Sequence, residues 1–116
     1  LVEELRLALG HDAVVQFDGP VDTAVPSELA QHALAVVREA LTNIARHAAA
    51  SATRVEVTAT ETLRIRVRDN GVGVGSATGF SGLRNLRDRA EQLGGRFTLH
   101  SPAHGGTELV WQVPIR

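Results

Sequence analysis

The stretch that decides the fold is Leu63-Arg64-Ile65-Arg66-Val67-Arg68-Asp69-Asn70-Gly71-Val72-Gly73-Val74-Gly75. Its first six residues alternate apolar and cationic side chains, which predicts a strand with one buried face, because residues two apart point the same way. Asp69 falls on the apolar side of that alternation. A buried carboxylate needs hydrogen-bond donors, and a ligand can supply those that the protein does not. The glycines that follow would let the backbone come close to such a ligand.

The pair Asn70-Gly71 also has a simpler interpretation, since it is the commonest signature of a two-residue hairpin turn. Two features count against that interpretation. The segment from Val72 to Gly79 contains three more glycines and shows no strand partner. A hairpin would also leave Asp69 unexplained on the apolar face.

Composition limits the class of protein. The 116 residues are 43% hydrophobic with a net charge of -1 and no long apolar run, which predicts one soluble, cytoplasmic domain over residues 1–116 without membrane contact. The sequence has no basic cluster of the kind that a nucleic-acid-binding surface requires. Cysteine is absent, which excludes thiolate metal sites in this chain. Lysine is absent too, which excludes the P-loop and the eukaryotic protein kinase site, so any ATP site is of another type.

The remaining periodicity predicts helices and further strands around this strand. Residues 1–9 are expected to be the tail of a longer preceding helix, because they begin without a capping residue. Strands are expected at 14–17, 53–59, 97–100 and 107–113, and the strand at 53–59 should form a hairpin with that at 63–69. Helices are expected from Pro26 to about Ala48 and at 82–93. The expected apolar stripe of the longer helix is Leu34, Val37, Leu41, Ile44 and Ala48.

The polar side of the longer helix carries Glu39, Asn43, Arg46 and His47. Glu39 and Asn43 are four residues apart, so they lie on one helix face. An amide oxygen together with waters suits Mg²⁺, and Arg46 suits phosphate oxygens. A solvated helix face is the simpler interpretation of such a set on an isolated helix.

Two glycine-containing segments could approach an anion or support a site. Gly82 opens a helix after Gly79-Phe80-Ser81, which would offer free backbone N–H groups and the positive end of the helix dipole. An ordinary glycine at a helix start is the alternative. Gly105-Gly106-Thr107 is most often a loop that leads into a strand.

The order of these features is more specific than any one of them: Glu39-x-x-x-Asn43, Asp69-x-Gly71-x-Gly73, Gly79-x-x-Gly82-Leu83 and Gly105-x-Thr107. This order resembles the ATP-binding domain shared by gyrase, certain chaperones, histidine kinases and mismatch-repair ATPases, the Bergerat (GHKL) fold. Residues 38–43 and 82–90 resemble sensor kinases that signal to LuxR-type regulators. The lysine-free, alanine- and arginine-rich usage suggests an actinobacterial source, and the chain resembles the mycobacterial dormancy sensor kinases (DosS/DosT type).

The resemblance implies an α/β (α+β) two-layer sandwich, with a mixed, mainly antiparallel sheet covered on one face by helices. It also implies roles on the metal and phosphate side of the site. Asn43 would hold Mg²⁺, and Glu39 would be catalytic, either by orienting a metal-bound water or by assisting proton transfer. Arg46 and His47 would lie near the phosphates.

On the nucleotide side, the resemblance implies that Asp69 accepts a hydrogen bond from the adenine amino group. Thr107 would support Asp69 from the last strand. Gly71 and Gly73 would line the adenine pocket, and Gly82-Leu83 would approach the phosphates. ATP and Mg²⁺ are the implied cofactors.

The implied function is that of the catalytic ATP-binding domain of a two-component sensor histidine kinase. Its γ-phosphoryl group would go to a histidine on a separate dimerisation domain of the same kinase, and a LuxR-type response regulator would act downstream. Two alternatives stay open: an anti-sigma-factor serine kinase, and a nucleotide-sensing or interaction module without transfer activity. The uncapped first helix favours the sensor kinase.

The chain departs from many histidine kinases between its two glycine motifs. Those kinases carry a long lid there, whereas only Ser76-Ala77-Thr78 separate Gly75 from Gly79 in this chain. We therefore expect the isolated domain to bind ATP weakly.

Overall fold

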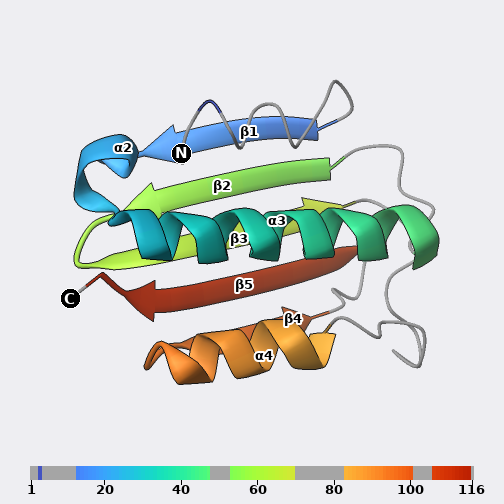
Figure 1. Ribbon diagram of the computed structural model, residues 1–116. Helices are drawn as coiled ribbons and strands as arrows, with labels where there is room; N and C mark the ends of the chain where they lie inside the picture. Colours follow the sequence, from blue (N-terminus) through green and yellow to red (C-terminus); the bar gives the residue numbers. More distant parts are fainter. Residues whose placement is uncertain (1–2, 4–12, 48–52, 70–82, 101–105, 116) are drawn as a thin grey trace.

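A five-stranded sheet with helices on one face forms the described part of the chain (Figure 1). The computed structural model describes residues 3, 13–47, 53–69, 83–100 and 106–115. The strands are β1 (Ala13–Asp18), β2 (Thr53–Ala59), β3 (Thr62–Asp69), β4 (Arg96–His100) and β5 (Thr107–Pro114). The helices are α2 (Val21–Ala24), α3 (Ser27–His47) and α4 (Leu83–Gln92). The helix expected over residues 1–9 lies outside the described residues, apart from Glu3.

The strands follow the order β1-β2-β3-β5-β4 across the sheet. β1 pairs with β2 in parallel, and the other neighbours pair antiparallel. The hairpin of β2 and β3 is confirmed, with Val55 opposite Val67 and Val57 opposite Ile65. The mixed, mainly antiparallel sheet of the predicted two-layer sandwich is therefore confirmed.

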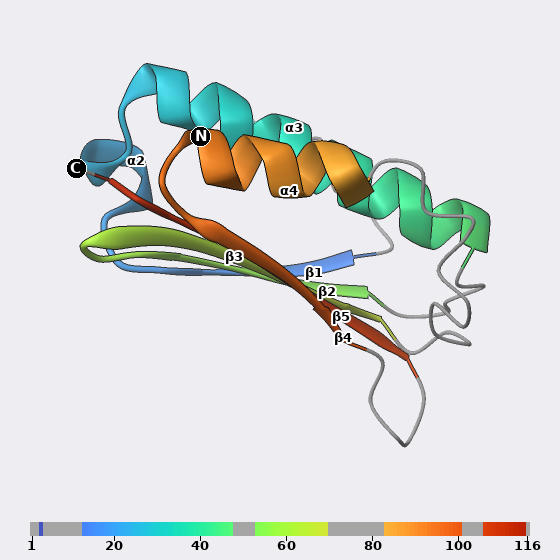
Figure 2. The same ribbon diagram turned by 90° about the horizontal axis from the view of Figure 1, so that it is seen from below.

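One face of the sheet is apolar, and both α3 and α4 lie on it (Figure 2). The alternation in β3 is the reason, because Leu63, Ile65 and Val67 are almost completely buried while the intervening arginines face the other way. β2 and β5 follow the same alternation in register with β3. Each Å² of apolar surface buried on this shared face contributes roughly 25 cal/mol to the stability of the domain.

The buried side of α3 differs from the predicted stripe. The helix buries Leu29, Ala33, Val36, Val37 and Ala40, whereas Leu34 and Leu41 are only half-buried. The predicted stripe is therefore buried at Val37, and Leu34 and Leu41 pack against the core from its margin, while the side chains of the stripe beyond Leu41 lie outside the described part. Small alanines bring the helix close to the sheet, and the longer leucines then cover the margins of the contact.

Two polar contacts fix α4 against the rest of the fold. The indole Nε1 of Trp111, in the middle of β5, donates to the backbone carbonyl of Leu86 at 3.2 Å. On the helix side, Nη1 of Arg89 lies 2.8 Å from Nδ1 of His32 on α3. Because a guanidinium only donates hydrogen bonds, the imidazole nitrogen is the acceptor in that contact. The sheet and α3 together hold α4 in place.

The open face of the sheet carries an ion-pair network. Arg66 contacts the carboxylate of Glu108 at 2.8 Å and that of Glu56 at 3.8 Å, and Arg68 contacts Glu56 at 2.7 Å. These charges stand on neighbouring strands, so the alternation that builds the core also brings cations and carboxylates together on the other side.

The Arg66–Glu108 pair makes stability depend on pH. The hydrogen bond from Arg66 lowers the pKa of Glu108 below its usual range, and the same bond raises the pKa of Arg66. A carboxyl with a lowered pKa contributes stability above its unfolded-state pKa, and that contribution disappears as the pH falls through the folded-state pKa. We expect Glu108→Gln to reduce the unfolding free energy at neutral pH by up to about 1 kcal/mol.

Urea unfolding at neutral pH and near pH 3 checks this expectation. The loss of stability between the two pH values should be smaller in Glu108→Gln than in the unmodified chain. Glu61→Gln is the matched control, because Glu61 is exposed and has no ion pair with a described residue. Equal losses in Glu108→Gln and in the unmodified chain would contradict a role for the ion pair.

Candidate functional site

Four segments that carry the expected site residues meet at one end of the molecule (Figure 1). β3 ends there at Asp69 and β5 begins there at Thr107, because the two strands are antiparallel. The last turns of α3 and the first turn of α4 lie at the same end (Figure 1). The topology therefore brings the two helix ends over the Asp69 end of the sheet.

Asp69 lies on the helix-covered face, as its phase in the strand predicts. Its register partners are Thr107 on β5 and Thr53 on β2, so a row of hydroxyl, carboxylate and hydroxyl side chains crosses three strands. The sequence prediction missed Thr53, although the alternation with Val55 and Val57 places it on the same face. The apolar core thus ends in a polar row of Thr53, Asp69 and Thr107 at this end of the sheet, called the Asp69 row below.

Burial makes this polar row unusual. Thr107 is only 5% exposed, and the atoms Oγ1 of Thr107 and Oδ2 of Asp69 are closed to solvent. The Thr107 hydroxyl finds no hydrogen-bond partner among the side chains and backbone groups that the structure describes. A buried hydroxyl without a partner costs about 1 to 3 kcal/mol. The row therefore fits a ligand that brings its own donors and acceptors, as the edge of a purine base does.

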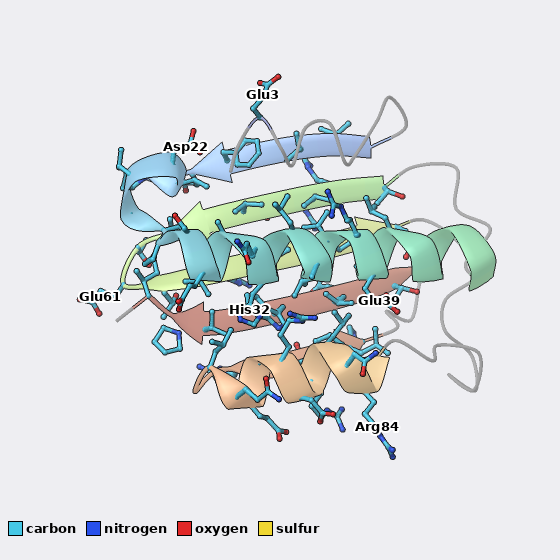
Figure 3. The ribbon with its side chains drawn as sticks, viewed as in Figure 1. Glu3, Asp22, His32, Glu39, Glu61 and Arg84 are labelled. Atoms are coloured by element: carbon cyan, nitrogen blue, oxygen red, sulfur yellow. The ribbon has the colours of Figure 1, made fainter. Side chains whose placement is uncertain are left out.

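The metal and phosphate side is described less completely. Glu39 is half-buried and lies in the C-terminal half of α3, toward the Asp69 end of the sheet (Figure 3). Asn43, Arg46 and His47 follow on the last turns of α3, and their side chains lie outside the described residues. Asn43 is one helical turn beyond Glu39, about 6 Å along the axis, which carries the polar face toward the end of the helix.

The glycine motifs are described only at their edge. Leu83 is the first described residue of α4, one residue after the predicted start at Gly82, and its side chain lies outside the described part. Gly71, Gly73 and Gly82 also lie outside it. Their expected roles in lining the adenine pocket and approaching the phosphates stay predictions.

The described residues at this end do not form a metal site of their own. Within the described ranges, no group of three or more histidine, aspartate or glutamate side chains could enclose a metal ion. Mg²⁺ is commonly held by one or two protein oxygens, several waters and the phosphates of a substrate. The amide expected from Asn43, together with the carboxylate of Glu39 one turn earlier on α3, would suit that mode of binding.

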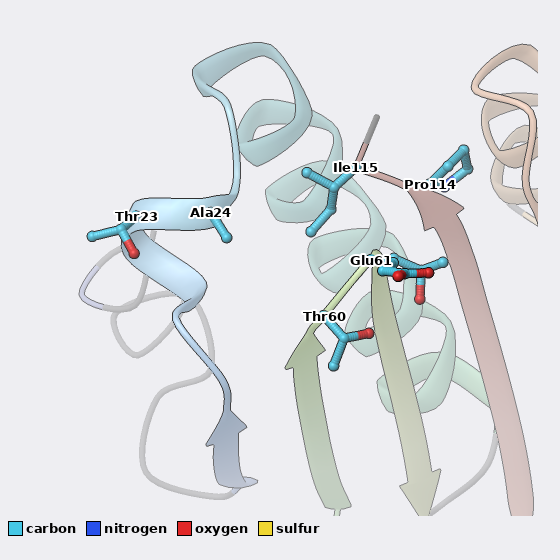
Figure 4. Close-up of a pocket in the computed structure, with 7 residues that line it drawn as sticks. Thr23, Ala24, Thr60, Glu61, Pro114 and Ile115 are labelled. Atoms are coloured by element: carbon cyan, nitrogen blue, oxygen red, sulfur yellow. The ribbon is translucent and has the colours of Figure 1, made fainter.

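A hollow of about 810 Å³ lies at the opposite end of the sheet (Figure 4). It is lined by Thr23, Ala24, Thr60, Glu61, Thr62, Pro114 and Ile115. None of these side chains is fully buried, so the hollow lacks the enclosed polar groups of the Asp69 row. Size alone therefore does not identify the functional site. Among the helices that the structure describes, none is long and apolar enough to cross a membrane.

Comparison with known proteins identifies the family of the chain. Residues 28–116 match the family of histidine kinase-, DNA gyrase B- and HSP90-like ATPases. The nitrate/nitrite sensor protein NarQ of Escherichia coli is 40% identical over 89 residues, which is 72% of this chain and 16% of NarQ. The chain thus spans about a sixth of this curated relative.

Solved structures show the same fold. The ATP binding domain of PrrB from Mycobacterium tuberculosis has a TM-score of 0.66 at 22% identity, over 97% of this chain and 91% of that domain. The blue-light activated histidine kinase EL346 of Erythrobacter litoralis has a TM-score of 0.66 at 23% identity, over 98% of this chain and 39% of that chain. The family match covers more than half of the chain and includes all the residues expected in the site. The chain therefore belongs to the family of histidine kinase-, DNA gyrase B- and HSP90-like ATPases.

Proposed function

We propose that this chain is the catalytic ATP-binding domain of a cytoplasmic sensor histidine kinase, one that passes the γ-phosphoryl group of ATP to a histidine on a separate dimerisation domain of the same protein. The observation that carries the proposal is the pairing of Asp69 with Thr107, whose Oδ2 and Oγ1 atoms are closed to solvent, at the end of the sheet where α3 ends and α4 begins. Family membership supports ATP as the ligand.

The adenine end of the proposed site rests on Asp69. Its carboxylate can only accept hydrogen bonds when ionised, which suits the exocyclic amino group of adenine, a donor. The hydroxyl of Thr107 stands on the neighbouring strand in the same row and can donate to that carboxylate or to a ring nitrogen. Gly71 and Gly73 would let the backbone pass close to the base.

The phosphate end would use few reactive side chains. Phosphoryl transfer requires mainly positioning and charge neutralisation. Mg²⁺ would supply most of the neutralisation, with Asn43 as its protein ligand. Glu39 would orient a metal-bound water or take up a proton, while Arg46 and His47 would face the phosphate oxygens. Backbone N–H groups at Gly82 and Leu83 would add the positive end of α4.

Titration calorimetry of the chain with ATP, with and without Mg²⁺, tests the proposed site directly. Weak but measurable binding that strengthens with Mg²⁺ is the expected result. Absence of binding at millimolar ATP would contradict the nucleotide site. Tight binding would contradict the expected consequence of the short connection between Gly75 and Gly79.

Asn43→Ala should impair transfer far more than folding. Loss of the only amide ligand proposed for Mg²⁺ is expected to lower the rate of phosphoryl transfer by about 100-fold or more, since the ion neutralises charge in the transition state. The rate is measured by mixing the chain with a separately produced dimerisation and phosphoacceptor domain. Asn85→Ala is the matched control, because Asn85 is an exposed asparagine on α4. Equal rates for both variants would refute the metal role of Asn43.

The downstream partner belongs to the same proposal. The stretches 38–43 and 82–90 resemble kinases that signal to LuxR-type response regulators, and the lysine-free composition resembles the mycobacterial dormancy sensor kinases (DosS/DosT type). Phosphotransfer from the reconstituted kinase to a panel of LuxR-type and other response regulators tests this assignment. A preference for another class of regulator would contradict it.

Two alternatives predict different outcomes of the same mixing experiment. An anti-sigma-factor serine kinase would share the nucleotide site but would phosphorylate a serine of a protein substrate. A nucleotide-sensing module would bind ATP and leave the phosphoacceptor histidine unmodified. Acid-labile phosphate on the dimerisation domain distinguishes the proposed function from both.

A further inference from the structure

The open face of the sheet carries two arginines without carboxylate partners, far from the Asp69 row. Arg64 on β3 and Arg96 on β4 both pair in register with Gln112, on the strand between them. Both are exposed, and neither forms an ion pair with any described residue. Since neighbouring strands lie about 4.8 Å apart, β5 holds the two arginines about 10 Å apart.

The rest of this face is nearly neutral. The arginines nearer the Asp69 end contact Glu56 or Glu108, as described for the ion-pair network. Asp18 on β1 stands two strands from Arg64, about 10 Å away. Glu61 lies in the turn before β3 and points outward from the end of the sheet (Figure 3). The unbalanced positive charge is therefore confined to the row of Arg64 and Arg96.

A hollow of about 270 Å³ adjoins this row. It is lined by Thr62, Gly94, Gly95, Arg96, Gln112, Val113 and Pro114. Gly94 has a φ of +78°, and a Cβ there would lie 3.8 Å from Cγ of Pro114. A larger residue would be strained and would occupy the hollow, so glycine keeps it open.

The polar groups around the hollow are arranged as donors. Nε2 of Gln112 donates to Oγ1 of Thr62 at 3.1 Å, which fixes the amide and leaves the hydroxyl hydrogen of Thr62 to donate elsewhere. Arg96 adds the donors of its guanidinium. A carboxylate can accept from a hydroxyl and a guanidinium together, and its charge strengthens both hydrogen bonds.

We propose that this row, Thr62, Arg64, Arg96 and Gln112, binds an acidic segment of a partner protein. One carboxylate lies in the hollow against Arg96 and Thr62, and a second meets Arg64. A segment in the polyproline II conformation rises about 3.1 Å per residue with three residues per turn, so carboxylates three residues apart share one face and span the two arginines.

The surroundings provide room for such a segment. The hollow of Figure 4 shares Thr62 and Pro114 with the smaller one, so the two adjoin along the end of the sheet. The proposed surface is on the opposite face and at the opposite end from the Asp69 row. A partner and a nucleotide can therefore be bound at the same time.

Charge favours a protein partner over a phosphate polymer or a lipid surface. Two unpaired arginines form a small positive region, and the same face displays Glu56 and Glu108. Nucleic acids and anionic membranes bind through many cations spread over a wide surface. A short acidic segment needs only the two arginine side chains that this row offers.

NMR titration of the chain with a defined peptide tests the proposal. The probe is a ten-residue peptide with blocked ends in which glutamate recurs every third residue among serines, and its glutamine analogue is the uncharged control. We expect the glutamate peptide to shift the backbone amides of Thr62, Gly95 and Gln112, and to bind more weakly as salt increases. Shifts confined to other residues, or equal binding of the glutamine peptide, would overturn the proposal.

Variants localise the binding. Arg64→Gln combined with Arg96→Gln should weaken peptide binding about tenfold, whereas Arg54→Gln, an exposed arginine near the other end of the same face, should change it less than twofold. Unchanged binding by the double variant would overturn the proposal. So would tighter binding, on an equal-charge basis, to DNA or to vesicles containing phosphatidylserine.

The fold and the nucleotide site are checked separately on the same variants. ATP titration and thermal unfolding of the double variant should match those of the unmodified chain. A failed peptide titration with intact ATP binding would refute this surface and leave the proposed kinase function standing. Failed ATP binding with intact peptide binding would refute the proposed kinase function and leave this surface standing.

Discussion

Asp69→Asn is expected to lower the affinity of the chain for ATP by about 100-fold, close to 3 kcal/mol of binding free energy. The substitution replaces an acceptor-only carboxylate with an amide that must present a donor to one of its neighbours. The charged hydrogen bond to the adenine amino group is then replaced by a neutral one at best. Adenine selectivity should fall together with affinity, so GTP and ATP should bind almost equally weakly.

The fold should survive that substitution. Asp69 is the last residue of β3, and its backbone pairing with β2 and β5 does not depend on the side chain. A half-buried carboxylate is also costly to desolvate, so replacing it by an amide of the same shape should not raise the desolvation cost of folding. We expect the thermal midpoint to stay within about 5 °C of that of the unmodified chain.

Calorimetric titration with ATP and GTP measures the effect. Asp18→Asn is the matched control, because Asp18 is also the last residue of its strand but is exposed. That control should bind ATP as the unmodified chain does. If Asp69→Asn kept its ATP affinity, the adenine would have to bind elsewhere.

Trp111→Ala should cost about 4 kcal/mol of unfolding free energy, the largest stability effect of any single substitution that we propose. Trp111 is fully buried at the centre of β5 and packs in register with Ile65 and Phe97. Truncation opens a cavity between the sheet and α4 and also removes the indole donor to the carbonyl of Leu86. Both losses weaken the interface between the sheet and α4. We therefore expect α4 to shift in this variant as the unfolding free energy falls.

Trp111→Phe separates the two contributions. It keeps an aromatic ring in the core and loses only the indole N–H and part of the ring volume, for an expected cost of about 1 to 2 kcal/mol. Urea unfolding followed by circular dichroism is the appropriate measurement, since Trp111 is the only tryptophan and both variants lose fluorescence. A cost below 1 kcal/mol for Trp111→Ala would contradict the packing described for α4.

The strands were predictable from sequence because their alternation is strong. The apolar and arginine residues of 63–68 assign each side chain to a face, and Asp69 follows by phase. The same alternation predicts the register neighbours of the hairpin. The end of α4 was predictable to within one residue, since the helix ends at Gln92, just before the predicted end at Leu93, and Gly94-Gly95 follows.

Other features depend on contacts between distant segments. The four-residue helix α2 is too short to show a period, and the parallel pairing of β1 with β2 leaves no local signal in either strand. The burial of Ala33 instead of Leu34 follows from how closely α3 approaches the sheet. The partner of each arginine on the open face also depends on strand order, which local pattern does not specify.

The candidate site was predictable in its outline. Asp69 and Thr107 were assigned to one site through a resemblance in motif order, and the register now places them opposite each other. Thr53 was missed because a threonine at the start of a strand has many ordinary roles. The side chains of Asn43, Arg46 and His47 and the glycines of the two motifs lie outside the described residues, so their roles continue to rest on the motifs.

The alternation in β3 also constrains which length changes this gene can accept during evolution. Loss or gain of one codon between Leu63 and Asp69 would reverse the phase of every later side chain, which would move the carboxylate to the open face and an arginine beneath the helices. A change of two codons would restore the phase and only displace the polar row along the strand. Where functional relatives differ in length, we therefore expect the difference at the β2–β3 turn and almost never as a single residue within β3.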